Sequence, residues 1–290
     1  MIEENGNTES IATQIVHENL AFSIIDMFVM DSMVVCKTEN ESPVFMCYDV
    51  IDGENKKNLG TIGRAQNEWI KPQMVARTDK GYDIFDNGKA MILSYNNDTL
   101  ISKRNYQEMI AVNRPRMINE TYSGYSYIQP NKTALVIYDA ETYKQMDEYA
   151  FEDDTQEGHS INWDFSWSGE MKNIVIAHLY KKEFYVLNLN DNGTISQCKK
   201  FVGEYVFNRK EHAYYSDAII SDGLIYLLNQ QHVKMNNEDG NSEIDIFDMA
   251  GKHIKKLQLD IVARYMCVVG DNIWLLDIDN NMRVCNNTII

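Results

Sequence analysis

One short sequence pattern recurs along the chain and sets the strongest limit on its fold. Each copy has a short apolar strand that ends in an aromatic residue or Leu, then Asp or Asn, a turn that often contains Gly, and a second strand in which polar and apolar residues interleave. The Asp or Asn side chain can bond the backbone two residues on, and Gly tolerates a positive φ, so each copy predicts a β-hairpin. The clearest copies span residues 43–62, 133–151, 183–202 and 242–259.

Two fainter copies, at 91–107 and 281–290, bring the number to six. The successive Asp or Asn residues that mark the copies are 47, 43, 49, 60 and 38 positions apart, and they are Asp49, Asn96, Asp139, Asn188, Asp248 and Asn286. Blades of β-propellers have four short strands and repeat at roughly 40–50 residues. The sequence therefore predicts an all-β, six-bladed β-propeller with four-stranded antiparallel blades, a single domain over 1–290. The competing architecture, a two-sheet sandwich, does not need six copies of one hairpin.

The segments ahead of the hairpins predict the remaining strands. Strand pairs are indicated at 22–37, 218–229 and 265–278, where the apolar runs are nearly continuous. Such runs are typical of sheets buried on both faces, as between neighbouring blades. The polar segment 230–242, rich in Gly and Asn, is expected to be an exposed loop.

The two ends of the chain are predicted to meet in the last blade. The copy at 281–290 stops before its outer strand could form, and the spare strand at the N-terminus is 12–18. We expect 12–18 to pair with the strand around Arg283, because this pairing removes an exposed sheet edge.

Charge and cysteine usage narrow the choice of partners and cofactors. The chain has 27 Lys and Arg against 43 Asp and Glu, a net charge of −16, which argues against a nucleic-acid partner. No stretch approaches 18 apolar residues, so no transmembrane segment is expected. The five cysteines lack zinc-site spacing. Cys36 and Cys47 flank a predicted turn, where they are either two buried thiols, as is usual for strand cysteines, or a disulfide across the hairpin.

The hairpins, together with residues 48–69, resemble the TolB-like six-bladed propeller proteins of gut anaerobes. In that family the first hairpin leads into a Gly-rich stretch of the type G-x-G-x-G-P-x-E-[FY]. Gly60, Gly63, Glu68 and Trp69 match this stretch, and Gln66-Asn67 stands in place of its Gly-Pro. The resemblance covers nearly the whole chain and implies the propeller fold and a cell-envelope location, as a periplasmic protein or lipoprotein, but no reaction. An envelope location requires a leader left off this chain, and a cytoplasmic location is expected if Met1 is the true start.

Arginines gather in the predicted connections between blades. Of the eight arginines, five lie there: Arg64, Arg114, Arg116, Arg209 and Arg264. These connections share one face of a propeller, so we expect the five guanidinium groups to converge at one mouth of the channel. There they could bind carboxylate, sulfate or phosphate groups through paired N–H donors. Other residues expected to wall this site are Trp69, His159, Trp163 and His212. In the alternative, the arginines pair with local acids such as Glu68, Glu120 or Glu211 and hold loops in place.

Two classes of function remain open. The first is a non-enzymatic binding module, a monomer without a cofactor, that recognises a protein or an anionic glycan at the channel mouth. The second is a metal-dependent hydrolase or lactonase with a cation in the central channel, for which the candidate ligands are Asn113, Glu120, Asn162 and Asp217. No nucleophile motif is complete, since 124–128 (GYSYI) has Ile128 where G-x-S-x-G requires Gly. His178, inside an apolar run, is expected to be a packed strand residue. We therefore predict binding rather than catalysis.

Overall fold

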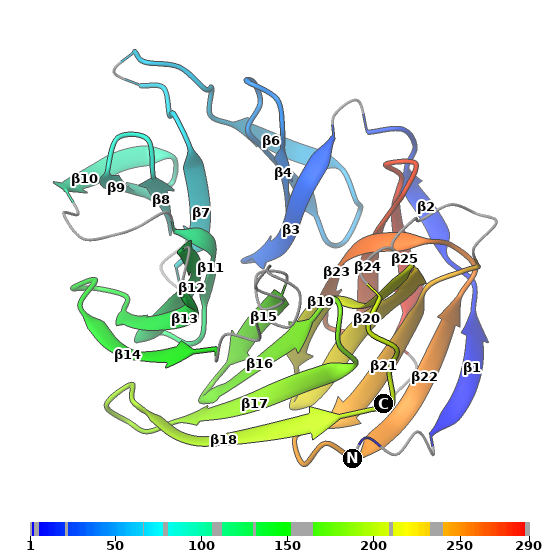
Figure 1. Ribbon diagram of the computed structural model, residues 1–290. Helices are drawn as coiled ribbons and strands as arrows, with labels where there is room; N and C mark the ends of the chain where they lie inside the picture. Colours follow the sequence, from blue (N-terminus) through cyan, green and yellow to red (C-terminus); the bar gives the residue numbers. More distant parts are fainter. Residues whose placement is uncertain are drawn as a thin grey trace. The chain divides into compact units, whose positions relative to one another are not determined.

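All regular elements in the described part of the chain are β-strands (Figure 1). The computed structural model describes residues 2, 6–20, 23–65, 67–77, 81–105, 112–129, 132–151, 165–208, 211–232 and 240–287. The strands form six antiparallel blades of four, one for each predicted hairpin, which confirms the six-bladed β-propeller. The blades belong to two compact units. The first comprises 22–153 and 190–195, and the second comprises 1–21, 154–189 and 196–290.

The unit built on residues 22–153 holds three blades whose strands pair in chain order. The first blade consists of β3 (Ile24–Met30), β4 (Met33–Thr38), β5 (Phe45–Asp49) and β6 (Asn55–Leu59). The second consists of β7 (Pro72–Ala76), β8 (Gly81–Asp86), β9 (Met91–Asn96) and β10 (Thr99–Asn105). The third consists of β11 (Asn113–Met117), β12 (Tyr122–Gln129), β13 (Lys132–Asp139) and β14 (Gln145–Ala150).

The other unit holds the last three blades and the N-terminal strands. Its first blade consists of β15 (Phe165–Glu170), β16 (Asn173–His178), β17 (Glu183–Leu189) and β18 (Ile195–Val202). The next consists of β19 (His212–Ser221), β20 (Leu224–His232), β21 (Glu243–Asp248) and β22 (His253–Leu259). The last consists of β23 (Ala263–Val269), β24 (Asn272–Asp277), β25 (Met282–Asn286) and, from the N-terminus, β2 (Gln14–His17).

Two details of this unit differ from the prediction. The strand β1 (Asn7–Ile11) adds a fifth, parallel strand to β22, which the hairpin pattern did not indicate. The strand β20 continues to His232, so the first three residues of the segment 230–242 are strand; 240–242 are irregular, and 233–239 lie outside the described part.

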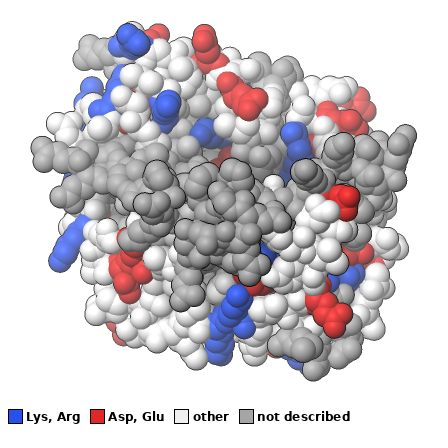
Figure 2. Space-filling view, in the orientation of Figure 1, with Lys and Arg blue, Asp and Glu red and all other residues white. Residues whose placement is uncertain are grey.

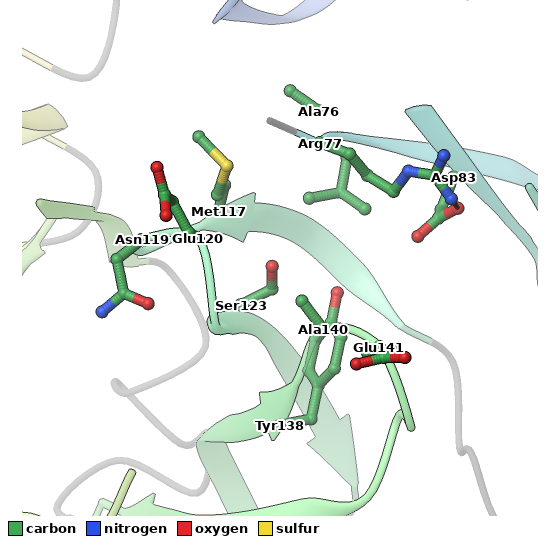
Figure 3. A pocket seen from close by; sticks show the side chains of 11 residues that line it. Ala76, Arg77, Asp83, Met117, Asn119, Glu120, Ser123, Tyr138, Ala140 and Glu141 are labelled. Atoms are coloured by element: carbon green, nitrogen blue, oxygen red, sulfur yellow. Dashed lines mark hydrogen bonds and ion pairs between the residues drawn. The ribbon is translucent and has the colours of Figure 1, made fainter. Parts of the chain in front are cut away.

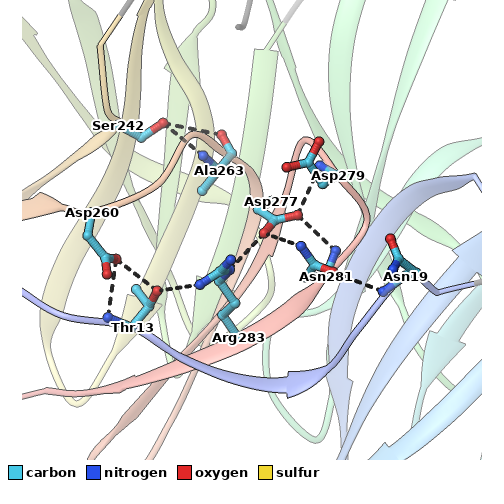
Figure 4. Close-up of polar contacts among 9 residues, drawn as sticks. All are labelled: Thr13, Asn19, Ser242, Asp260, Ala263, Asp277, Asp279, Asn281 and Arg283. Carbon is cyan, nitrogen blue, oxygen red and sulfur yellow. Dashed lines mark hydrogen bonds and ion pairs between the residues drawn. The ribbon is translucent and has the colours of Figure 1, made fainter. Parts of the chain in front are cut away.

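The N-terminal strand completes the last blade as predicted. β2 runs antiparallel to β25, with Ile15 opposite Arg283. Figure 4 shows the polar contacts that fasten this pairing. Arg283 donates through Nε to Asp277 Oδ2 (2.7 Å) and through Nη1 to Thr13 Oγ1 (3.3 Å). The Thr13 hydroxyl in turn donates to Asp260 Oδ1 (2.8 Å). The β25 edge is thereby covered, as expected for a sheet that avoids an open edge.

The nearly continuous apolar runs arise because both faces of each blade are buried. Consecutive residues of a strand point to opposite faces. Met74 packs with Phe28 in one core cluster, and its neighbour Val75 packs with Tyr125 in the next. Leu227 and Leu228 divide in the same way between two clusters of the other unit. Strands such as β7 and β20 have no solvent-exposed face, so they lack the polar residues of an alternating pattern.

The Asp residues that mark the hairpins form the turns expected of them. Asp49 Oδ1 accepts a hydrogen bond from Ile51 N–H (2.8 Å), and Asp248 Oδ1 accepts one from Ala250 N–H (2.9 Å). Asp139 Oδ1 accepts from both the N–H and the hydroxyl of Thr142, each at 2.7 Å. These bonds satisfy backbone donors inside the turn and hold the hairpin at its tip.

The buried cysteines and His178 also follow their simpler predictions. Cys36 and Cys47 are free thiols. Cys36 lies opposite Met46 and Cys47 opposite Val35, so the two sulfur atoms project from opposite faces of the sheet and cannot bond. His178 is 1% exposed on β16. Burial, with smaller contributions from Lys181 and Lys200, lowers the pKa of its imidazole to about 3.

Candidate functional site

The first strands of the blades in the unit 22–153 bring charged side chains together. β7 contacts both β3 and β11. Asp26 lies on β3 and Lys37 lies opposite it on β4, while Arg114 and Arg116 lie on β11. We call these four residues the cationic cluster. Both arginines of the cluster are among the residues predicted to bind an anion.

Arg116 is held by contacts on three sides. Its Nη2 donates to Asp26 Oδ1 at 2.6 Å, and its Nη1 donates to the backbone carbonyl of Pro115 at 3.0 Å. Its guanidinium carbon lies 4.8 Å from the centroid of the Phe28 ring, a cation–π contact. The side chains of Arg116 and Asp26 keep 16% and 10% of their surface exposed, so this pair is mostly buried.

A bulge in β11 positions the second arginine. The pairing of β11 with β12 shifts register between Asn113 and Arg116. Arg114 adopts a φ of 43°, a region that residues other than Gly seldom occupy, and Pro115 contributes no N–H to the sheet. Bulges of this kind bend a strand and redirect its side chains, and they are frequent beside functional sites.

The charged groups of the cluster shift each other's ionisation. Burial opposes ionisation of Asp26, but Arg116, Arg114 and Lys37 outweigh it and hold the pKa of its carboxyl below the usual value. Burial lowers the pKa of Lys37 to about 8, with the two guanidinium groups adding to the shift and Asp26 opposing it. Three cationic side chains therefore act on the carboxylate of Asp26.

The charged side chains on the surface are mixed in sign. On the face shown in Figure 2, Lys and Arg side chains occur in separate groups interspersed with Asp and Glu. The cationic cluster is a local gathering of positive side chains in a chain whose net charge is −16.

Of the five predicted arginines, Arg114 and Arg116 lie together on β11. Arg114, Arg116 and Arg264 lie on the first strands of their blades, β11 and β23, and not in the connections, which corrects their predicted position. A guanidinium on a long side chain can reach a polar environment from a strand whose stem is packed. Arg264 donates through Nη2 to Asn280 Oδ1. Arg64 does lie in the connection from β6 to β7 and is exposed.

Of the residues predicted to wall the site, the structure describes Trp69 and His212. His159, Trp163 and Arg209 lie outside the described residues. His212 begins β19, and its ring stacks on Tyr214 with centroids 6.4 Å apart. Trp69 is 4% exposed and packs in the core, where its Nε1 donates to the Tyr95 hydroxyl at 3.3 Å. This burial corrects the expectation that Trp69 lines an open site.

The Gly-rich stretch explains why Trp69 is buried. A Cβ on Gly60 would lie 1.8 Å from the indole of Trp69, and the φ of Gly60 is +76°. Glu68 accepts the N–H of Ala65 at Oε2 (2.8 Å), which closes the same loop. The residues that carry the family resemblance therefore pack the indole against the blade, and this role is structural.

Asp26 and Lys37 were not predicted as site residues. Both carry a charge within an otherwise apolar strand, at the third residue of β3 and the fifth of β4. A charged residue inside a run that is buried on both faces needs a partner, and this requirement was the available signal.

The candidate metal ligands that the structure describes lie on different elements. Asn113 begins β11, and Glu120 is exposed in the turn that follows this strand. Asp217 is buried on β19, where it accepts hydrogen bonds from Ser166 Oγ (2.6 Å) and Met266 N–H (3.0 Å). Asn162 lies outside the described residues. In the ranges that are described, no group of three or more His, Cys, Asp and Glu side chains is placed to hold a metal ion. Within the same ranges, no helix is long and apolar enough to cross a membrane.

Comparison with known proteins identifies the fold. No protein-family model matches the sequence, and no curated protein does either. Among solved structures, U3-55K is 9% identical, with a TM-score of 0.57 over 94% of this chain and 98% of that chain. The Bacteroides fragilis protein BF0058 is also 9% identical, with a TM-score of 0.56 over 96% and 99%. Hsv2 from Kluyveromyces lactis is 11% identical, with a TM-score of 0.55 over 92% and 75%. At these identities the likeness extends to the fold alone.

Proposed function

We propose that this protein is a non-enzymatic binding module that recognises an acidic ligand, on a protein or a glycan, at the cationic cluster. The observation that carries the proposal is the local charge. Lys37, Arg114 and Arg116 all act on the carboxylate of Asp26, so three cationic side chains gather around one point of the fold. Guanidinium groups bind carboxylate, sulfate and phosphate through paired donors.

The place of the cluster in the fold supports this proposal. Propeller blades surround a central channel. The cluster involves β3 and β11, the first strands of two blades, and β7, the first strand of the blade between them, contacts both. Partial burial strengthens electrostatic attraction to a ligand, because the local dielectric constant is lower than that of water.

The proposal also covers the family of the protein and its location in the cell. We infer that it is a TolB-like propeller of the cell envelope, on the strength of the six hairpins and of Gly60, Gly63, Glu68 and Trp69. Acidic glycans and acidic protein segments are both available to an envelope protein, and either would meet the chemistry of the cluster.

A panel of labelled probes tests the proposal. We expect fluorescence anisotropy at low salt to detect binding of a heparin-derived hexasaccharide, of hexaglutamate, or of both. A neutral maltohexaose of similar length should not bind, because the cluster attracts charge and not sugar rings. Binding of the sulfated sugar alone assigns a glycan, and binding of hexaglutamate alone assigns a protein segment. Equal affinity for the neutral and the anionic hexasaccharide, or binding of neither anion, would reject the proposal.

A further inference from the structure

A cavity in the same unit differs in chemical character from the cationic cluster. It has a volume of about 270 Å³ and lies between the second and third blades (Figure 3). Val75, Ala76 and Met117 give it apolar walls. Its polar lining comprises Arg77, Asp83, Ser123, Tyr138, Glu120 and Glu141. The volume is slightly below the roughly 300–1,000 Å³ of sites for drug-sized ligands, so it suits a molecule the size of a monosaccharide.

A buried hydroxyl in this cavity has no partner. Tyr138 is 2% exposed, and within the described residues its hydroxyl oxygen has no partner at hydrogen-bond geometry, although the Ser123 hydroxyl is near enough to influence the pKa of the phenol. Figure 3 shows the phenol directed into the space beside Ser123 and Ala140. A buried hydroxyl without a hydrogen bond carries the full cost of its desolvation. A ligand hydroxyl or carbonyl in the cavity would remove this cost.

The charged residues that line the cavity differ in burial. The buried carboxylate of Asp83 is compensated: Tyr143 donates to its Oδ2 (2.8 Å) and Arg77 Nη1 lies 3.4 Å from its Oδ1. Glu120 and Glu141 are exposed. Within the described residues neither carboxylate forms an ion pair within 4 Å, and Arg104 donates to the backbone carbonyl of Glu141 and not to its side chain. The lining of the cavity therefore includes two exposed carboxylates that a cationic ligand could reach.

We propose that this cavity binds a small amine that carries hydroxyl groups, of the amino-sugar class. The ammonium group pairs with the carboxylate of Glu120 or of Glu141, and a ring hydroxyl takes the unmet hydrogen bond of Tyr138. The apolar walls cover the carbon face of the ring. This ligand is cationic, whereas the cationic cluster binds anions, so the two sites are tested independently.

Calorimetric titration with glucosamine tests the proposal, with N-acetylglucosamine as a probe that keeps the ring but loses the charge. We expect glucosamine to bind at least about tenfold more tightly than N-acetylglucosamine. Tyr138→Phe removes only the unpartnered hydroxyl. We expect it to weaken glucosamine binding about fivefold to tenfold while leaving the melting temperature unchanged or higher.

A pair of charge variants separates the cavity from general electrostatics. Glu120→Gln with Glu141→Gln should weaken glucosamine binding about tenfold or more. Glu39→Gln with Glu41→Gln removes the same charge from two exposed positions on the β4–β5 loop and should change affinity less than about twofold. The proposal is overturned if the wild type shows no saturable binding of glucosamine up to about 50 mM. Equal affinity for the two sugars, or unchanged affinity in Tyr138→Phe, overturns it as well.

Discussion

Lys37 combines burial with two neighbouring guanidinium groups, and its ionisation should therefore report the occupancy of the cationic cluster. An anion stabilises the ammonium form, so a ligand binds most tightly below the pKa of about 8 that Lys37 has in the free protein. As pH rises through this value, the neutral amine becomes common and affinity falls. We expect a loss of up to about tenfold in affinity between pH 7 and pH 9. Anisotropy of the anionic probe measures it. Lys37→Met should show a flat profile over this range, and the same loss in both proteins would assign the titration to another group.

Asp139 stabilises the fold through hydrogen bonds within its own turn. Its Oδ1 accepts three hydrogen bonds, from the N–H groups of Glu141 and Thr142 and from the Thr142 hydroxyl. Asp139→Ala should lower the free energy of unfolding by about 1–2 kcal/mol, as for the loss of a capping side chain. Urea denaturation measures this change, and Asp139→Asn, which keeps an acceptor, is the control. Loss of probe binding in Asp139→Ala with unchanged stability would show that the residue serves the ligand and not the turn.

At the scale of elements, β2 decides whether the last blade has an open edge. Deleting residues 1–18 removes β1 and β2 and leaves β25 unpaired at Arg283. We expect aggregation or a loss of several kcal/mol, since edge pairing and burial are lost together. Thermal unfolding checks this expectation. Deleting 1–12 removes β1 and keeps β2, and it should cost less. An unchanged melting temperature after deletion of 1–18 would contradict the role given to β2.

The strands and turns also show which parts of the fold could be predicted from the sequence. The hairpins were predictable because Asp49, Asp139 and Asp248 act within their own turns, and β2 followed from a missing strand. The pairing of β1 with β22 joins residues that are far apart in sequence and leaves no local pattern. Two errors at the site have a common cause. Sequence pattern does not show the bulge that places Arg114 and Arg116 on a strand, or the contact with Gly60 that buries Trp69.

At the scale of the whole molecule, a net charge of −16 coexists with a local positive site. The long-range field repels an acidic ligand, while the cationic cluster attracts it at short range. Salt screens charges over about 8 Å at physiological ionic strength. We therefore expect the affinity for the anionic probe to fall between about 50 and 300 mM salt, less steeply than for a basic protein, because repulsion is screened as well. Anisotropy titrations at several salt concentrations measure the slope, and an affinity independent of salt would contradict an electrostatic site.

The central claim is that the cationic cluster binds an acidic ligand. The most direct test is the calorimetric Kd of the anionic probe for the double variant Arg114→Asn with Lys37→Met. Asn tolerates the φ of 43° at position 114, and the pair Arg116–Asp26 stays intact, so the fold should be kept. Lys103→Met with Lys144→Asn removes the same charge from two exposed positions and is the matched control. We predict that the double variant binds at least about tenfold more weakly than the wild type, with the control within about twofold. Equal affinities in the folded double variant and the wild type would contradict the claim.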